Sequence, residues 1–412
     1  MNNFFPRLCW LVGAVLMSGM KETLLLDAQE AAQPGSLSDH RATLETQALY
    51  HNLQMLQGKQ FLFGHQDSLA YGFTWQNEPD RSDVKDVTGS FAGLQGWDVS
   101  RIELGADSNL DGVSFELMKN NIKRTYLRGG VNTISWHMTN PVSGGKYNDT
   151  KTQAVQAILP GGTKHAIYKQ YLDAFVAFNS QLTVIGKDGV ASVIPIIFRP
   201  LHEHNGEWFW WGEGNATEQD FIQLWQFTVN YLRDVKQQHN LIIAFSPDRS
   251  RINLNRFELD YLYAYPGDQY VDIVGLDNYW DLGHPENTAS TARQQKDFVT
   301  GLEGLARVAK IKRKIPALTE AGAEGIPDAA FWTNSFLKNI LVSEGSRQIV
   351  YAMMWRNATD GGHNKKHFYV PYKGQASAAD FLKFKLNHAV VFEDELPPMY
   401  KKPIEDAKII AR

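Results

Sequence analysis

The chain has 412 residues, of which 43% are hydrophobic and 21% charged, and its formal net charge is −4 at pH 7. This length suits one large α/β domain or two ordinary ones, and the composition is sufficient to bury a core. Charges of both signs are interspersed without a basic stripe, which argues against nucleic acid as a partner.

Residues 1–19 have the pattern of a secretory signal peptide. Arg7 precedes the apolar run LCWLVGAVLM, which is followed by small residues and is too short to predict a membrane span. Met20 stands where a lipoprotein signal would carry cysteine, so a lipid anchor is not supported. We therefore expect export to the periplasm, the cell surface or the medium, with residues 20–38 as a tether and no transmembrane domain. Cys9 is the only cysteine, so the mature domain is expected to contain no disulfide and no cysteine-based metal site.

Short β-rich runs recur along the rest of the chain, and each ends in polar residues. The eight runs span residues 60–67, 90–98, 131–140, 193–203, 241–248, 272–280, 314–322 and 349–357. Helical periodicity lies between most of them, at residues 42–56, 166–178, 217–239, 291–310 and 329–343. Apolar strands alternating with helices predict parallel strands covered on both faces.

Eight such βα units predict a single (β/α)8 TIM barrel over residues 39–395, followed by a tail at 396–412. A doubly wound sheet is the alternative, because the number of strands does not prove closure. The chain contains no heptad pattern, internal repeat, phosphate-binding loop or dinucleotide fingerprint, so we expect no cofactor. We also expect a monomer.

In a closed barrel the carboxyl ends of all strands face one rim, where TIM barrels carry their active sites. In chain order, the strand ends offer His65 and Asp67, Trp97 and Asp98, Trp136 and His137, Arg199, His202, Glu203 and Asn205, Ser246 and Asp248, Asp277, Asn278 and Tyr279, Glu320, and finally Trp355 and Arg356. Polar residues from every strand are hard to explain as caps of the sheet alone. Their convergence predicts an active site.

The segment RPLHEHNGEWFWWG, residues 199–212, is the most informative of these strand ends. A carboxylic acid flanked by imidazoles and followed by four large aromatic residues suggests a site for a flat, hydroxylated ligand with a tuned carboxyl pKa. Successive side chains point in different directions, so at least two of the four aromatics are expected in the core, with Trp208 in the cleft. Glu207 and Glu213 are expected to be solvated. The alternative is a strand end whose polar residues only cap the sheet.

Glu203 and Glu320 are the two glutamates at these strand ends, after the fourth and seventh strands. Those strands lie on opposite parts of a barrel wall, so the two side chains can face each other across a cleft. A pair of carboxyl groups flanking a bond hydrolyses glycosides when one is protonated and the other ionised. Asp98 and Asp277 have shorter side chains and are expected to bind hydroxyls or to orient partners.

A metal site is the weaker interpretation of the histidines. His65 and His137 could form a pair of ligands, but no third ligand has suitable spacing. We therefore expect no metal, and hydrogen bonds from these side chains to sugar hydroxyls instead.

The segments RPLHEHNGEWFWWG, GLDNYW, LTEAG and MMWRN occur in an order and spacing that resemble the β-mannanases of glycoside hydrolase family 26, and FLFGHQD and GWD also fit. The resemblance covers about residues 40–390, and His204 departs from it where an apolar residue or Met is more usual. It implies a TIM barrel in which Glu203 is the general acid/base and Glu320 the nucleophile.

The same resemblance implies the roles of the surrounding residues. Tyr279 would be a partner of the nucleophile and His202 a support beside the acid/base. The subsite next to the scissile bond would be lined by Trp208, Trp355 and Arg356, with His137 nearby. Burial against Trp208 is expected to raise the pKa of Glu203, and Arg356 to keep a nearby carboxylate ionised.

The implied activity is endo-acting, retaining hydrolysis of β-1,4-mannosidic linkages in mannan, galactomannan or glucomannan, with carboxyl groups roughly 5–5.5 Å apart. The expected partner is therefore a polysaccharide or oligosaccharide. A β-1,3-xylanase or a mixed-linkage β-glucanase of the same clan is the first alternative. The others are a metal-dependent barrel hydrolase and a non-catalytic glycan-binding barrel, although the latter should lack one of the two glutamates.

Overall fold

The computed structural model describes residues 35–186, 189–358 and 366–401. The predicted signal peptide, most of the predicted tether and the last residues of the predicted tail lie outside these described residues. All elements named below belong to one unit of the chain.

Eight parallel strands form a closed ring. They are β1 (Phe61–Gln66), β2 (Leu94–Asp98), β3 (Val131–Ser135), β6 (Ile196–Arg199), β7 (Leu241–Phe245), β8 (Ile273–Asn278), β9 (Ile315–Ala321) and β10 (Tyr351–Met354). The ring closes because β10 pairs with β1, with Met354 opposite His65. Closure confirms the predicted TIM barrel and excludes the doubly wound sheet. The short strand β11 (Val390–Val391) pairs in parallel with the first two residues of β1, Phe61 and Leu62.

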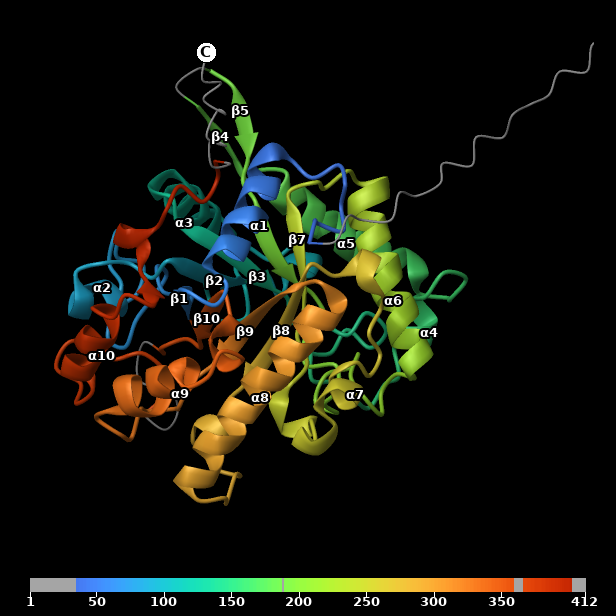
Figure 1. Ribbon diagram of the computed structural model, residues 1–412. Helices are drawn as coiled ribbons and strands as arrows, with labels where there is room; N and C mark the ends of the chain where they lie inside the picture. Colours follow the sequence, from blue (N-terminus) through green and yellow to red (C-terminus); the bar gives the residue numbers. More distant parts are fainter. Residues whose placement is uncertain (1–34, 187–188, 359–365, 402–412) are drawn as a thin grey trace, which may run out of the picture. The chain divides into compact units, whose positions relative to one another are not determined.

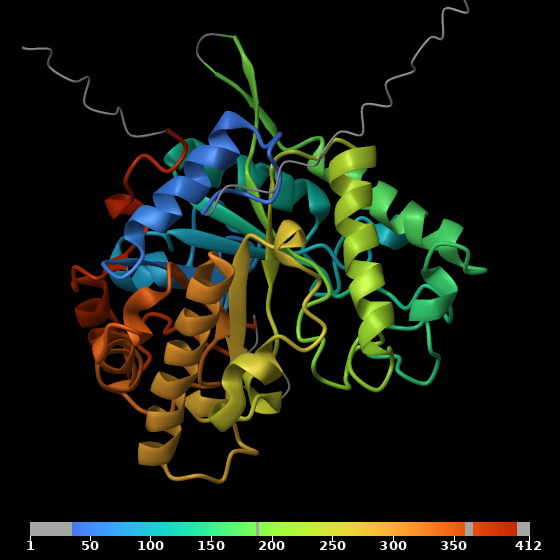
Figure 2. The same cartoon turned by 45° about the vertical axis from the view of Figure 1, so that its right-hand side comes forward.

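Helices surround the barrel on its outer side (Figures 1 and 2). They are α1 (Leu44–Leu56), α2 (Asp83–Thr88), α3 (Phe115–Arg128), α4 (Val155–Ile158), α5 (His165–Asn179), α6 (Glu218–Asn230), α7 (Phe257–Tyr261), α8 (Thr291–Lys312), α9 (Lys338–Leu341) and α10 (Ala378–Lys385). Hydroxyl side chains begin several of them: Thr217 accepts a hydrogen bond from the Asp220 N–H at α6, and Ser290 caps α8 in the same way. The predicted helix at residues 329–343 starts instead as a π-helical turn, Phe331–Leu337, that leads into α9.

The core follows from the alternation of side chains along each strand. Leu62 belongs to one buried cluster and its neighbour Phe63 to the other. The cluster of Leu62 receives a side chain from each of the eight barrel strands and is therefore the barrel interior, closed at one end by Leu49 and Leu53 of α1. The cluster of Phe63 lies between the strands and the outer helices. This packed interior supports the strand ends that carry the site.

The structure corrects the predicted strand at residues 193–203. Val193 belongs to β5 (Ala191–Val193), which pairs antiparallel with β4 (Thr183–Ile185), and this hairpin projects away from the barrel in both views (Figures 1 and 2). The barrel strand β6 begins only at Ile196, directly after Pro195. Proline has no N–H to donate to a sheet, so it separates the two strands.

Residues 396–401, which the sequence assigns to a tail, lie against the barrel. Met399 is buried, and its carbonyl oxygen accepts a hydrogen bond of 2.9 Å from the side-chain amide of Asn52 on α1. The Tyr400 hydroxyl donates to the Gly130 carbonyl oxygen at 2.7 Å. None of the helices in the described parts of the chain has both the length and the apolar character needed to cross a bilayer.

Candidate active site

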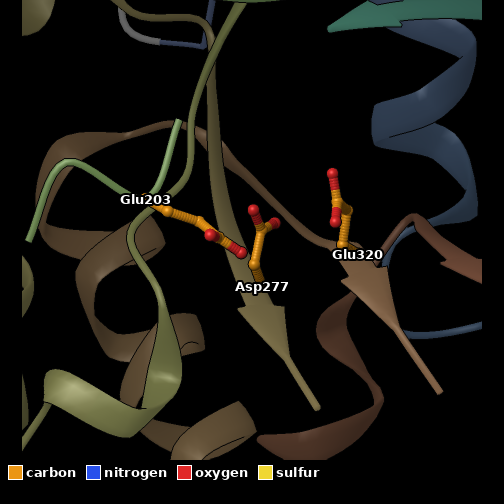
Figure 3. A group of neighbouring side chains, drawn as sticks. All are labelled: Glu203, Asp277 and Glu320. Atoms are coloured by element: carbon orange, nitrogen blue, oxygen red, sulfur yellow. The ribbon is translucent and has the colours of Figure 1, made fainter. Parts of the chain in front are cut away.

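Three carboxyl groups meet at the carboxyl end of the barrel (Figure 3). Glu203 lies on the loop after β6, Asp277 near the end of β8, and Glu320 near the end of β9. One oxygen of each lies within 4.8 Å of one oxygen of the other two. The structure therefore brings together the two glutamates that the sequence singles out.

The loop that carries Glu203 adopts an uncommon backbone conformation. Leu201 has φ = 47° and Glu203 has φ = 52°, in the left-handed region that residues with a side chain seldom adopt. The Glu203 N–H donates to the Ser246 carbonyl oxygen at 2.8 Å, which ties the loop to the end of β7. Such conformations cost free energy and persist where the surrounding structure holds them, often at functional sites.

Glu203 lies in an environment that favours its protonated form. Burial raises the pKa of Glu203 well above its ordinary value, and three neighbouring carboxyl groups add to the effect. They belong to Asp248, Asp277 and Glu320. Trp208 acts in the opposite direction, because its indole N–H donates to Glu203 Oε2 at 2.8 Å and stabilises the anion. The expected rise in the pKa of Glu203 is therefore present, but the hydrogen bond from Trp208 opposes it.

Glu320 has the opposite surroundings. Its Oε1 accepts a hydrogen bond from the guanidinium of Arg199, and its Oε2 accepts one of 2.7 Å from the Tyr279 hydroxyl. Arg199 is buried, with 1% of its surface exposed. A buried cation and a hydroxyl donor both stabilise a carboxylate in its charged form. The position of Tyr279 beside the nucleophile candidate agrees with the predicted partnership.

The cation beside Glu320 is Arg199 and not Arg356. Arg356 instead pairs with Asp111 on the connection after β2, at 3.2 Å between Nη2 and Oδ1. The sequence marked Arg199 only as a residue at a strand end. A cation directly after a fully apolar strand was the available signal, because a charge buried at such a place requires a partner.

Asp277 positions Arg199. Its Oδ2 accepts from Arg199 Nη1 at 2.9 Å and its Oδ1 from the Thr319 hydroxyl at 2.6 Å. A register shift between Leu276 and Asp277 places Asp277 opposite Glu320 across the β8–β9 pair. Because protein donors engage both of its oxygens, the geometry favours the orienting role for Asp277 over direct contact with a sugar.

The same three carboxyl groups are close enough together to be candidate ligands of a metal ion. Arg199 contacts two of them, Asp277 and Glu320, and supplies positive charge where a cation would otherwise lie. Neither His65 nor His137, the two histidines considered from the sequence, belongs to this group.

Asp98 and His137 form a charged pair beside the cleft. Asp98 Oδ2 lies 2.8 Å from His137 Nδ1 and also accepts from the His137 backbone N–H, while Oδ1 accepts from the Ser100 N–H. Burial opposes ionisation of both groups, but their mutual attraction prevails. It raises the pKa of His137 above its ordinary value and lowers that of Asp98. Asp98 therefore orients His137 and holds its proton.

The pKa of His202 is shifted in the opposite direction to that of its neighbour His137. The two rings meet edge to face with centroids 4.7 Å apart, and the Phe209 ring lies 5.0 Å from His202. Burial lowers the pKa of His202 well below its ordinary value, and the positive charge of Arg199 adds to this effect. His202 is thus a neutral imidazole packed directly before Glu203 in the chain.

Two neighbouring cavities open at the site. One of about 510 Å³ is lined by Glu203, Trp208 and Tyr279, and another of about 430 Å³ by Glu320, Trp355 and Tyr279. Residues that the sequence did not single out complete the walls: Arg251 in the first cavity, and His284 and Glu286 in both. They lie on irregular connections after β7 and β8, where no periodicity or strand end marks them.

The aromatic segment divides as the sequence predicted. Trp208 is half-buried and lines the cavity of Glu203, whereas Phe209, Trp210 and Trp211 are 4%, 0% and 0% exposed. The Trp211 indole N–H donates to the His202 carbonyl oxygen at 2.8 Å and so helps to fix the loop that carries Glu203. Glu207 and Glu213 are exposed, as expected. Trp97 and Trp136, which the sequence places at strand ends, are both buried in the core.

Comparison with known proteins points to one family. The model of glycosyl hydrolase family 26 matches residues 38–340. A solved GH26 beta-mannanase from Bacteroides ovatus is 37% identical, with a TM-score of 0.78, and the match covers 87% of this chain and 98% of that one.

Two curated relatives carry the name mannan endo-1,4-beta-mannosidase. The protein from Bifidobacterium adolescentis is 33% identical over 362 residues, which cover 85% of this chain and 34% of the relative. The protein from Bacillus subtilis is 32% identical over 231 residues, covering 51% and 56%. The chain thus spans about a third to a little over half of the length of these relatives.

Proposed function

The chain belongs to glycosyl hydrolase family 26, and on this premise we propose that it is a mannan endo-1,4-β-mannosidase that works with retention of configuration. The observation that carries the proposal is the contrast between Glu203 and Glu320, whose oxygens approach within 4.8 Å. One carboxyl lies where protonation is favoured, and the other accepts hydrogen bonds from the guanidinium of Arg199 and the hydroxyl of Tyr279. Glycoside hydrolysis needs this combination of an acid and a base.

The reaction then proceeds in two displacements. Glu203 donates its proton to the glycosidic oxygen while Glu320 attacks the anomeric carbon, so the bond to the leaving sugar breaks as the bond to Glu320 forms. Glu203, now a carboxylate, takes a proton from water, and that water releases the sugar from Glu320. The short separation of the oxygens supports retention, because an inverting pair stands roughly 6.5–9.5 Å apart to admit a water.

The surrounding residues support this chemistry. Arg199 and Tyr279 hold the two oxygens of Glu320, so the attacking carboxylate has a fixed direction. His137, whose pKa is raised by its contact with Asp98, and the half-buried Trp355 are suited to bind the sugar at the cleavage site. Arg356, held by Asp111, is suited to bind a sugar in the subsite next to the scissile bond.

A product time course tests the proposal. Purified protein is incubated with linear mannan, galactomannan, glucomannan, xylan and mixed-linkage glucan, with and without a chelator. We expect hydrolysis of the mannans, insensitivity to the chelator, and an early ladder of manno-oligosaccharides from endo action. Mannobiose alone from the start would indicate exo action, and the absence of mannan hydrolysis would refute the proposal. Preferential cleavage of xylan or mixed-linkage glucan would establish the same-clan alternative instead.

We also propose that the protein is exported and acts as a monomer. The charged start and apolar run of residues 1–19 support export. Mass spectrometry of the mature protein from culture fractions would locate the processing site, and a mass that includes the first 19 residues would contradict export. Size-exclusion chromatography with light scattering tests the monomer against the chain mass of 46.6 kDa.

A further inference from the structure

The cavity of Glu203 marks the leaving-group side of the scissile bond. An acid that protonates the glycosidic oxygen must lie next to the sugar that departs with that oxygen. The cavity of about 510 Å³ contains Glu203 but not Glu320. Its lining consists of Glu203, Trp208, Asp248, Ser250, Arg251, Tyr279, Trp280, His284 and Glu286.

Arg251 is the single arginine or lysine in this lining. Two other charged residues of the wall, Asp248 and Glu286, only accept hydrogen bonds when they are ionised. Trp208 has one donor, and that donor is engaged with Glu203. The hydroxyls of Ser250 and Tyr279 are engaged with Asp248 and Glu320. The ring N–H groups of Trp280 and His284 can each donate one hydrogen bond, whereas the Arg251 guanidinium carries five N–H groups and is the largest source of donors in this lining.

The guanidinium is held only loosely by the protein. Its partner is Glu207, with 3.3 Å between Nη2 and Oε1, and the two side chains are 41% and 74% exposed. Ion pairs this exposed contribute little to stability, so a sugar can replace Glu207 as partner at small cost. The Cζ atom of Arg251 also lies 5.3 Å from the centre of the Trp208 ring, which keeps the guanidinium beside the cleft.

The backbone that presents Arg251 is anchored to the loop of Glu203. Arg251 ends a short helical turn, Arg249–Arg251, that starts at Asp248, whose Oδ1 accepts from the Ser250 N–H at 2.7 Å. The side chain of Asn205 bonds both the N–H and the carbonyl oxygen of Asp248, each at 2.8 Å. Asn205 follows Glu203 by two positions, so the acid and the start of the Arg251 turn are linked by direct hydrogen bonds.

We propose that Arg251 is a specificity-determining residue on the leaving-group side, where it donates hydrogen bonds to hydroxyl or ring oxygens of the departing sugar. The inference rests on the proposed function and extends it to a residue outside the catalytic pair. In this proposal the departing sugar contacts a guanidinium that lies against Trp208, and not an indole ring alone. A leaving group without sugar oxygens gains nothing from Arg251.

The test compares two substrates in three proteins. Wild type, Arg251→Ala and the control Arg256→Ala are assayed on mannohexaose and on 2,4-dinitrophenyl β-mannobioside, whose leaving group has no sugar hydroxyl. Arg256 lies on the same connection after β7, is paired with Asp260, is 63% exposed and does not line the cavity. In Arg251→Ala we expect kcat/KM to fall about ten- to a hundredfold on mannohexaose, the size of a lost charged hydrogen bond, and to stay within about twofold on the aryl glycoside.

A second measurement separates sugar binding from an indirect effect on Glu203. Added mannotriose competes with water for the glycosyl-enzyme by binding on the leaving-group side, so Arg251→Ala should give fewer transfer products per hydrolysis event. Equal losses on both substrates would show that Arg251 acts through Trp208 and Glu203, and unchanged values would show no role. Either result overturns the inference while leaving the proposed function intact. A wild type inactive on every mannan substrate overturns both.

Discussion

Glu203 and Glu320 are chemically identical side chains whose oxygens lie within 4.8 Å and which share Asp277 as a neighbour, yet their hydrogen-bond donors differ. Glu203 accepts from a single indole donor among carboxyl groups. Glu320 accepts from a buried guanidinium and a phenol. The same residue type is therefore suited to act as an acid at one position and as a nucleophile at the other because of its neighbours.

The difference also separates two ways of building a site. The anion depends on a few strong contacts made by strand residues, since Arg199 and Asp277 lie within β6 and β8. The acid depends on burial and on the repulsion of several groups at intermediate distance. Removing one of the residues that contact Glu320 should therefore lower activity sharply. Among the residues on the Glu203 side, the largest loss of activity should come from removing Glu203 itself.

The largest effect is expected from removal of the nucleophile. Glu320→Ala should lower kcat/KM on mannan on the order of 10⁵-fold, because no covalent intermediate can form. The loss should be equally severe on an activated aryl mannoside, since both substrates require the attack. Kinetics with both substrates and circular dichroism of the variant check this. Retention of a tenth of wild-type activity by a folded variant would contradict the assignment.

Removal of the acid should give a smaller and substrate-dependent loss. Glu203→Ala is expected to lower kcat/KM on mannan by roughly 10²–10⁴-fold, but far less on 2,4-dinitrophenyl β-mannobioside, whose leaving group needs no proton. The pKa of Glu203 is raised, so in the wild type kcat/KM should fall as pH increases through that value and the acid loses its proton. In the variant this alkaline decline should disappear on the aryl substrate. An equal loss on both substrates would exclude Glu203 as the acid.

Loss of one contact to the nucleophile should be smaller again. Tyr279→Phe removes the hydroxyl that donates to Glu320 Oε2 at 2.7 Å and leaves Arg199 in place. A hydrogen bond to a charged group contributes about 1.5–3 kcal/mol, so kcat/KM on mannan should fall about ten- to a hundredfold. Because the nucleophile serves both substrates, the aryl mannoside should suffer similarly. A loss confined to mannan would instead place Tyr279 in sugar binding alone.

Much of the fold could be predicted because the local signals are strong. Each barrel strand is a short apolar run that ends in polar residues, and this pattern located all eight. The strand ends then identified Glu203 and Glu320 as the facing pair. The projecting hairpin escaped prediction because β4 and β5 have only three residues each and are not fully buried.

The contacts between strands could not be predicted. Which carboxylate Arg199 meets depends on the register shift that brings Asp277 opposite Glu320, and a shift of this kind has no sequence signal here. Asp111 and Arg251 lie on irregular connections, so no period marks them as neighbours of the cleft. The sequence could therefore identify the reacting groups and, through the family resemblance, Tyr279 beside Glu320, but not the contacts that Arg199 and Asp277 make.

A final and smaller effect tests whether Asp98 sets the charge of His137, as the raised pKa of His137 indicates. Asp98→Asn keeps the shape of the side chain but removes the charge that raises the pKa of His137. The His137 contribution to stability is present at low pH and is lost as pH rises through its raised pKa, whereas that of Asp98 is lost as pH falls through its lowered pKa. The variant should thus be destabilised most between these limits, by about 1–3 kcal/mol near pH 6, and much less near pH 9.

Asp39→Asn is the matched control, because Asp39 Oδ2 lies 2.7 Å from His239 Nδ1 in a second aspartate–histidine pair. His239 precedes β7, so this pair lies at the amino end of the strands, opposite the site. Denaturant unfolding at both pH values and kcat/KM on mannan are measured for the two variants. Only Asp98→Asn should lose activity, by about three- to tenfold, since His137 lies at the carboxyl ends of the strands, with its ring 6.1 Å from that of Trp355. Equal activity in both variants would show that the Asp98–His137 pair stabilises the barrel without serving the reaction.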